Sequence, residues 1–238
     1  MKVYILIGYY VGVGYEIIEV YSTNEKAEQA KSLNPKSSDG TSFAFLNIME
    51  YDFMIYYFTP YSLQKNLGQC YNQYMNLIGD DDVAVMMDGD TCFLTPDYGV
   101  YIAEYVKQYP DAVLTCWTNR INEKAEQQYR LIHREESDMV IHLQQAKYLQ
   151  EQPLSVTQLH GFVSGFLMVI PKKVWASVGG FAEKQVYEDR GPYNLLGVDN
   201  DFTNRVRAAG TPILRMDSIY IWHTYRLLTG DQDKSHLL

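Results

Sequence analysis

Two aspartates separated by a glycine are the clearest candidates for chemistry in this chain. Asp88, Gly89 and Asp90 follow directly on the apolar run Val83–Met87. A run of this length is typical of a strand buried on both faces of a sheet. Ligands of open α/β sheets bind beyond the carboxyl ends of the strands. Carboxylate oxygens at such a position can hold Mg²⁺ or Mn²⁺, whereas an ordinary solvated Asp-Gly turn is the alternative that needs no metal.

Three other side chains stand where a predicted strand ends or a helix begins. Asp199 and Asp201 lie at the start of a helical segment, and His223 follows an aromatic run. Each has a structural alternative, because aspartates often cap helix N-termini and a lone histidine is often a packed core residue. Taken one by one these signals are weak, and their order along the chain is what makes them informative.

Composition limits the classes of partner. The chain has 238 residues and a formal net charge of −9, which argues against a general surface for nucleic acids or anionic membranes, since both require clustered Lys and Arg. The three cysteines, Cys70, Cys92 and Cys116, are odd in number and show no CxxC spacing, so we expect buried free thiols. No stretch reaches the length of a membrane span, and no signal-peptide pattern begins the chain. We therefore expect a soluble cytoplasmic protein without an integral membrane segment.

Residues 1–53 are predicted to form a separate small α+β unit. Two β-like runs, Lys2–Tyr10 and Glu16–Tyr21, flank Gly12-Val13-Gly14, which favours a hairpin over a nucleotide-binding loop because the third glycine and its helix are missing. A helix capped by Ser22 or Thr23 and a strand over 43–53 complete a ββαβ order. The unit resembles small uncharacterised domains appended to bacterial and phage proteins. It contains no titratable cluster, so its role stays open.

From Met54 the pattern changes to alternating strands and helices, which predicts an α/β domain over 54–238 with parallel pairing and right-handed crossovers. The polar stretch 119–152, with helical parts near 122–129 and 138–150, is either a flexible substrate loop or a surface helix pair. The other expected strands are 54–58, 83–87, 112–117, a strand ending at 170, 213–216 and 218–222, and the other helices are 63–78, 95–109, 171–178 and 201–209.

Six motifs in this second part occur in an order that resembles one enzyme family. They are YFTPYS at 57–62, Asn66-Leu67-Gly68 with Asn72, MMDGDTCFL around Asp88, the segment Gly161–Phe181 ending in Gly-Gly-Phe, GVDND at 197–201 continuing to Asn204-Arg205, and IYIWHTYR with His223. In this order they resemble the GT-A glycosyltransferases of the family-two type, whose DxD motif matches Asp88-Gly89-Asp90.

The resemblance implies a GT-A fold, a mostly parallel sheet flanked by helices, and transfer of a sugar from a nucleotide-diphosphate-sugar donor to a carbohydrate or other hydroxyl acceptor, with inversion. It implies Mn²⁺ or Mg²⁺ held by Asp88, Asp90 and His223, and Asp199 as the general base. The implied donor-binding residues are Thr59, Tyr61, Asn66, Asp88 and Gly89. The implied acceptor-binding residues are Gly161, Ser164, Gly165 and Asp201.

Two departures from the family pattern leave alternatives open. Val198 stands where the family usually has Glu, and no strand ending in Asp-Asp-Gly-Ser follows Pro60. An alignment that uses Met1–Tyr10 as the first strand is possible, but we favour a fusion of two units. A non-catalytic sugar- or nucleotide-binding module is the alternative function. A phosphohydrolase or nucleotidyltransferase would share the two aspartates of the DxD motif without explaining the other motifs.

Overall fold

The computed structural model describes residues 3–10, 14–21, 24–33, 35–36, 45–51, 53–63, 66–122, 124–183 and 197–225. The chain divides into two compact units, Met1–Met54 and Ile55–Leu238. This boundary lies one residue from the one predicted from the sequence.

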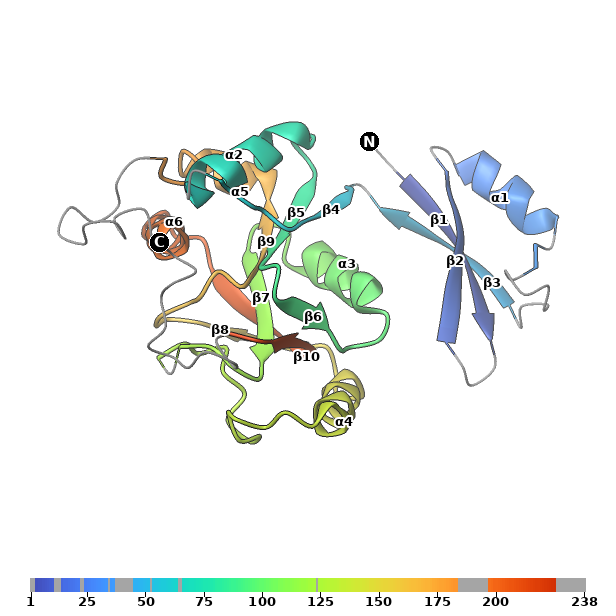
Figure 1. Cartoon of the computed structure of the whole chain (residues 1–238). Helices are drawn as coiled ribbons and strands as arrows, with labels where there is room; N and C mark the ends of the chain where they lie inside the picture. Colours follow the sequence, from blue (N-terminus) through green and yellow to red (C-terminus); the bar gives the residue numbers. More distant parts are fainter. Residues whose placement is uncertain are drawn as a thin grey trace. The chain divides into compact units, whose positions relative to one another are not determined.

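The first unit is a three-stranded antiparallel sheet with one helix (Figure 1). Strand β1 (Val3–Tyr10) is central and pairs with β2 (Gly14–Tyr21) and β3 (Phe45–Tyr51). Helix α1 (Asn24–Ser32) lies between β2 and β3 in sequence, which is the expected ββαβ order. Residues 12, 13, 22 and 23, on which the turn and the helix cap were predicted, lie outside the described residues.

The second unit is built on a seven-stranded sheet in the order β4-β5-β9-β7-β10-β6, with β8 also paired to β10. Strand β10 has a register irregularity between Met216 and Tyr220, and its outer edge pairs with β8 before this point and with β6 after it. The strands are β4 (Ile55–Phe58), β5 (Val83–Met87), β6 (Thr91–Phe93), β7 (Val113–Thr118), β8 (Val156–Gln158), β9 (Leu167–Pro171) and β10 (Ile213–His223).

Strand directions make this sheet mixed rather than uniformly parallel. Strands β4, β5, β7 and β10 run one way, whereas β9 is antiparallel to both neighbours, β5 and β7. The fully apolar run of β9 has the same residue pattern in either direction, so the sequence could not reveal its reversal.

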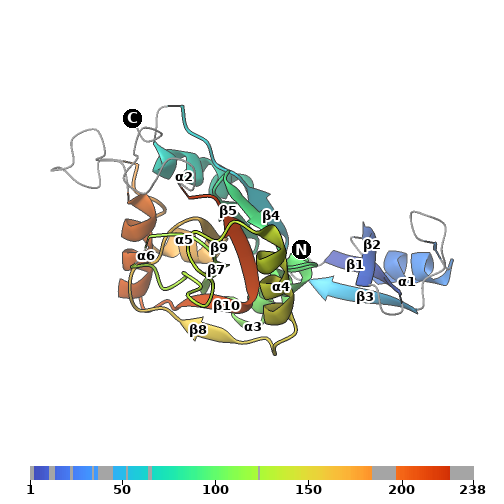
Figure 2. The same ribbon diagram turned by 60° about the horizontal axis from the view of Figure 1, so that its bottom comes forward.

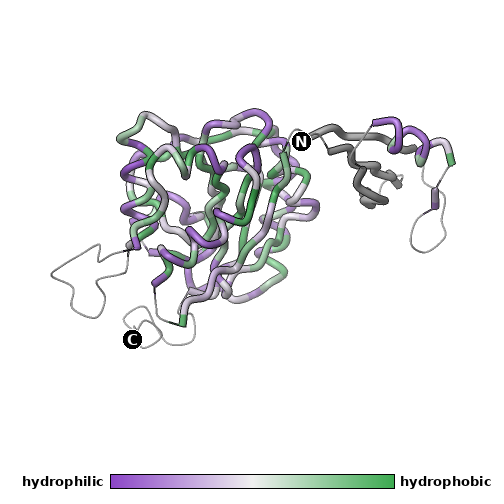
Figure 3. Tube along the Cα trace, turned by 90° about the horizontal axis from the view of Figure 1, so that it is seen from above, coloured by the Kyte–Doolittle hydropathy of each residue, from purple (hydrophilic) through white to green (hydrophobic). Residues whose placement is uncertain are grey.

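Helices cover both faces of this sheet (Figure 2). On one face lie α2 (Leu67–Leu77), α5 (Lys172–Ser177) and α6 (Val198–Ala208), and their apolar side chains pack in one core with those of the central strands. On the other face lie α3 (Tyr98–Gln108) and α4 (Met139–Gln150). The hydrophobic stretches of the unit run along its strands (Figure 3), as expected for a sheet buried between helix layers.

Several element boundaries differ from the prediction. Helix α2 begins at Leu67 rather than at Leu63, because the side chain of Asn66 accepts the N–H of Gln69 and caps the helix there. The predicted strands 213–216 and 218–222 are one strand, β10, which includes His223 as its last residue. The short strands β6 and β8 were not predicted.

The stretch 119–152 is neither a flexible loop nor a helix pair. Residues 124–129 form turns and isolated bridges instead of the predicted helix, and Ala125, Gln127 and Tyr129 are buried. Helix α4 is present close to its predicted bounds. Hydrogen bonds of buried amide side chains hold the irregular part in place. The periodicity of apolar residues in a sequence does not predict such bonds.

Two further expectations concern cysteines and membranes. Cys70 and Cys116 are buried free thiols as predicted, but Cys92, in the edge strand β6, is exposed. Among the described helices, none is long and apolar enough to span a bilayer.

Candidate metal centre and active site

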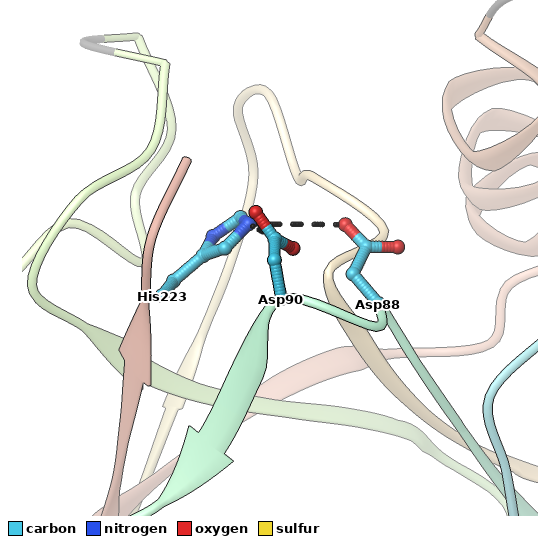
Figure 4. A group of neighbouring side chains, drawn as sticks. All are labelled: Asp88, Asp90 and His223. Atoms are coloured by element: carbon cyan, nitrogen blue, oxygen red, sulfur yellow. Dashed lines mark ion pairs between the residues drawn. The ribbon is translucent and has the colours of Figure 1, made fainter. Parts of the chain in front are cut away.

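Three potential metal ligands converge at one end of the second unit (Figure 4). One ligand atom each from Asp88, Asp90 and His223 lie within 4.8 Å of one another. Nε2 of His223 is 3.2 Å from Oδ1 of Asp90 and 3.9 Å from Oδ2 of Asp88. The carboxylates are half-exposed, with 43% and 49% of their side-chain surfaces accessible, whereas the histidine is buried.

The sheet topology explains why residues so distant in sequence meet. Strand β5 ends at Met87, and the turn Asp88–Asp90 leads into β6, whose Thr91 pairs with His223 at the end of β10. The N–H of Thr224 donates to the carbonyl of Asp90 over 3.0 Å. The antiparallel pairing of β6 with β10 therefore delivers the imidazole to the two carboxylates.

The chemistry and spacing of these donors fit a divalent cation. Two ligands at right angles around Mg²⁺, each about 2.1 Å away, are about 3 Å apart. The 3.2 Å between His223 and Asp90 is close to this value, and the 3.9 Å to Asp88 requires a small rotation of the carboxylate. A set of two carboxylates and one imidazole suits Mn²⁺ well, because imidazole is less favoured by Mg²⁺.

His223 is held by its backbone and by its ring neighbours. Its N–H donates to Oδ1 of Asn119 over 2.7 Å, and the amide of Asn119 donates back to its carbonyl over 3.2 Å. The ring stacks on Phe166 and packs against Tyr225, each at 5.4 Å between centroids. Its Nδ1 is buried without a hydrogen-bond partner in the described part of the chain. Ring packing and Asn119, rather than a bond to Nδ1, thus fix the direction of Nε2.

The two carboxylates differ in acidity. Partial burial, with help from the charges of Asp90 and Asp199, raises the pKa of Asp88 from 3.8 to about 6, against the attraction of His223. For Asp90, burial acts in the same direction, but the hydrogen bond and attraction of His223 outweigh it and hold the pKa below the usual value. Crowding of negative charge around Asp88 is the electrostatic situation that a bound cation would relieve.

Asp199 lies in the first turn of α6, close enough to Asp88 to influence its pKa. Its Oδ2 accepts the N–H of Gly165 over 2.8 Å, and its Oδ1 accepts the amide of Asn200 over 3.1 Å. Burial raises the pKa of Asp199 in spite of these bonds, of which that from Gly165 is the most effective in lowering it. A carboxylate with a raised pKa is a stronger base than one in water.

One segment links Asp199 to the metal ligands. Gly165 donates to Asp199, and the carbonyl of the next residue, Phe166, accepts the N–H of Asp88 over 2.9 Å. The ring of the same Phe166 stacks on His223. Two adjacent residues therefore set the positions of the candidate base and the candidate metal centre relative to each other.

Of the predicted donor-binding residues, Thr59 is beside the Asp-Gly-Asp turn. A Cβ placed on Gly89 would lie 3.4 Å from Cγ2 of Thr59, so the end of β4 packs against this turn. Tyr61 has 77% of its surface exposed. Its ring is free to contact a ligand, and its carbonyl accepts the thiol of Cys70.

Asn66 has a structural position instead. Its oxygen caps α2 and its amide donates to the carbonyl of Glu183 over 3.1 Å, so a nucleotide contact would replace one of these bonds. Asn72, six residues after Asn66, is bonded to Trp175 and to both the N–H and the carbonyl of Phe181. These two asparagines hold the Gly-Gly-Phe segment against α2.

The predicted acceptor-binding residues divide into two groups. Gly165 and Ser164 lie next to Asp199, and Gly161 precedes them on the same segment. Asp201 forms an ion pair with Arg205 over 2.6 Å, four residues along α6, and is not part of the metal cluster. A supporting role for Asp201 in its helix follows from this pairing.

Two residues of the site were not found from the sequence. Asn119 fixes His223, and Gln127 holds both backbone groups of Ser164 at 2.8 Å. Both lie in the polar stretch that gave no core periodicity. Since a buried amide and an exposed one look alike in a sequence, no signal was available.

Comparison with known protein families finds a match at the start of the chain. Residues 1–61 match the family described as Domain of unknown function (DUF7336). The match spans the first unit and continues through β4 to Tyr61. No curated protein matches the chain.

Proposed function

We propose that the second unit is a metal-dependent glycosyltransferase of GT-A type that moves a sugar from a nucleotide-diphosphate-sugar donor to a hydroxyl acceptor. The proposal rests on the meeting of Asp88, Asp90 and His223 beside the partly buried Asp199. The motif order in the sequence and an α/β sheet flanked by helices agree with it.

The chain's own residues account for the proposed steps. Asp88, Asp90 and His223 would hold Mn²⁺ or Mg²⁺, and the cation supplies positive charge against the donor diphosphate. Asp199 takes the proton of the acceptor hydroxyl while the oxygen of that hydroxyl forms a bond to the anomeric carbon of the donor sugar. The bond from this carbon to the diphosphate breaks, and the diphosphate leaves with the electron pair. Attack from the side opposite the leaving group inverts the anomeric centre.

Asp199 is suited to this role by its partial burial and by its fixed direction. The bond from Gly165 holds one oxygen, so the carboxylate cannot turn away. Its raised pKa makes it a better proton acceptor than an exposed aspartate, although the proton transfer still requires an acceptor hydroxyl within hydrogen-bond reach.

One observation favours the non-catalytic alternative. Strand β4 is the edge of the sheet among the described residues, so no further strand stands beside it at the place where the family's Asp-Asp-Gly-Ser strand was expected. Without this strand, the part of the domain that binds the donor would make fewer contacts with a nucleotide sugar. Binding without turnover is the outcome that would favour this module.

The test is incubation of the full chain with Mn²⁺ and a panel of nucleotide sugars, measuring binding by calorimetry and release of nucleoside diphosphate. We expect binding and release with at least one donor, loss of both in Asp88→Ala, and loss of release with retained binding in Asp199→Asn. Asp81→Asn is the matched control, because Asp81 is an exposed aspartate away from the cluster. Absence of binding to every donor, with Asp88→Ala indistinguishable from the parent, would refute the proposal.

A further inference from the structure

A cavity lies between helix α6 and the segment 160–163. It has a volume of about 390 Å³ and is formed by residues 160–163 together with Asn200, Asn204 and Arg207. Pockets for small ligands typically have volumes of roughly 300–1,000 Å³. None of the residues that line it belongs to the Asp88–Asp90–His223 cluster.

Both walls of this cavity also hold the candidate base. Asn200 lines the cavity and donates its amide to Asp199. The other wall, 160–163, continues directly into Gly165, which donates to the same carboxylate. The cavity and the candidate base therefore share two supports, Asn200 and the segment that leads to Gly165.

The lining offers groups that sugars use. Phe162 has 36% of its surface exposed and presents an aromatic side chain. The side chains of His160 and Asn204 have no hydrogen bond within the described part of the chain. An amide provides both donors and acceptors, so it suits hydroxyl groups, and an aromatic face suits the C–H face of a sugar ring.

The charge of the cavity is positive. Arg207 donates through Nη2 to the carbonyl of Gly161 over 2.7 Å, and its Nε is buried without a partner among the described residues. Of the five N–H donors of a guanidinium, three remain here besides the buried Nε–H and the one bonded to Gly161. No ion pair of Arg207 is found in the described ranges.

The carboxylates near the cavity are already bound to other groups. Glu126 accepts the N–H groups of His160 and Gly161, and Asp201 pairs with Arg205. Asp199 is bonded to Gly165 and Asn200. The guanidinium is thus left for an anion from outside the chain, in a protein whose net charge is otherwise −9.

We infer that this cavity binds an acidic sugar, a hydroxylated ring that carries a carboxylate or a phosphate group, with Arg207 binding the anion. The assignment of this sugar as the acceptor rests on the proposed function. The binding itself does not depend on that function, since it needs neither a metal nor a donor.

The test is an NMR titration of the full chain with glucuronate, glucose 6-phosphate, glucose and inorganic phosphate. We expect at least one acidic sugar to bind at least tenfold more tightly than glucose and than phosphate, because a charged hydrogen bond adds about this much. The two acidic sugars show which anionic group the cavity accepts. Equal binding of glucose, or binding of phosphate as tight as that of the tighter-binding acidic sugar, overturns the inference.

Variants locate the binding. Arg207→Gln should lower the affinity for the acidic sugar at least tenfold, and Asn204→Ala should lower it less. Lys147→Gln removes one positive charge from an exposed position on α4 and should have no effect. An amide NMR spectrum of Arg207→Gln that keeps the peak dispersion of the parent shows that this variant is folded. Acidic-sugar binding that stays within twofold in Arg207→Gln refutes the site.

The same variants separate this inference from the proposed function. If nucleotide sugars fail to bind but acidic sugars bind through Arg207, the transferase proposal fails and the cavity's ligand class stands. If a donor turns over and Arg207→Gln leaves the KM of an acidic acceptor unchanged, the transferase proposal stands and the acceptor role of the cavity fails. A KM raised at least tenfold with unchanged donor hydrolysis supports both.

Discussion

The backbone of Gly165 and the carboxylate of Asp199 are in direct contact. The N–H of Gly165 donates to Oδ2 over 2.8 Å, and a Cβ at this glycine would lie 2.7 Å from the Cβ of Asp199. Any side chain at position 165 would therefore push the aspartate away from its place. The glycine is required by this close approach.

We predict that Gly165→Ala lowers the rate of sugar transfer at least about a hundredfold, because a misplaced base loses its alignment with the acceptor. Mn²⁺ affinity should change less than about threefold, since Asp199 is outside the cation's ligand set. Steady-state kinetics and calorimetry check both. Gly99→Ala is the matched control, because its Cβ would meet only the hydroxyl of Tyr57, at an ordinary 3.6 Å. A transfer rate equal to that of the control would contradict the role given to this contact.

The raised pKa of Asp88 predicts how stability depends on pH. A carboxyl whose pKa is higher in the folded state, here about 6 against 3.8, favours folding while protonated. This contribution is lost as the pH rises through 6. Without metal, Asp88→Asn should therefore be more stable than the parent at pH 8, by about 1 kcal/mol once screening at the half-exposed side chain is allowed for.

Thermal unfolding at pH 5 and pH 8 checks this prediction. The stability gain of Asp88→Asn should diminish below pH 6, and Mn²⁺ should raise the Tm of the parent at pH 8 but not that of the variant. Asp81→Asn should behave as the parent. A variant less stable than the parent at pH 8 without metal would show that Asp88 is not electrostatically strained.

Asn119 is predicted to control the affinity of the metal centre through His223. Asn119→Ala removes both bonds to the backbone of His223 and should weaken Mn²⁺ binding about tenfold or more, as loss of supporting groups does at other metal sites. Asn119→Asp keeps the acceptor for the N–H of His223 and should recover part of the affinity. Asn122→Ala, at an exposed position nearby, serves as the control. Titrations that give the same Mn²⁺ affinity for Asn119→Ala and the parent would exclude this support.

Asn72 is predicted to contribute to stability rather than to catalysis. It accepts the indole N–H of Trp175 and bonds both backbone groups of Phe181, and 8% of its surface is exposed. Asn72→Ala leaves these groups unsatisfied in the core and should lower the free energy of unfolding by about 2–4 kcal/mol. Urea unfolding measures this change. The exposed Asn76→Ala, one turn along α2, should change it by less than about 0.5 kcal/mol.

Local residue patterns determined much of the fold. The run Val83–Met87 predicted β5 because an unbroken apolar stretch of this length needs burial on both faces, and Asp88 and Asp90 had to follow at its exposed end. Helix α4 was predictable within a residue or two. The division near residue 54 followed from the change to alternating strands and helices.

Tertiary structure alone decided how these pieces meet. His223 reaches Asp90 because β10 pairs with the unpredicted β6 in one particular register, and register depends on contacts between residues some 130 positions apart. The reversal of β9 and the burial of Asn119 and Gln127 have the same origin. The sequence by itself therefore determined which groups could do chemistry and at which strand ends they stand. Only long-range packing decided that Asp88, Asp90 and His223 form one cluster, with Asp199 held beside it by Gly165.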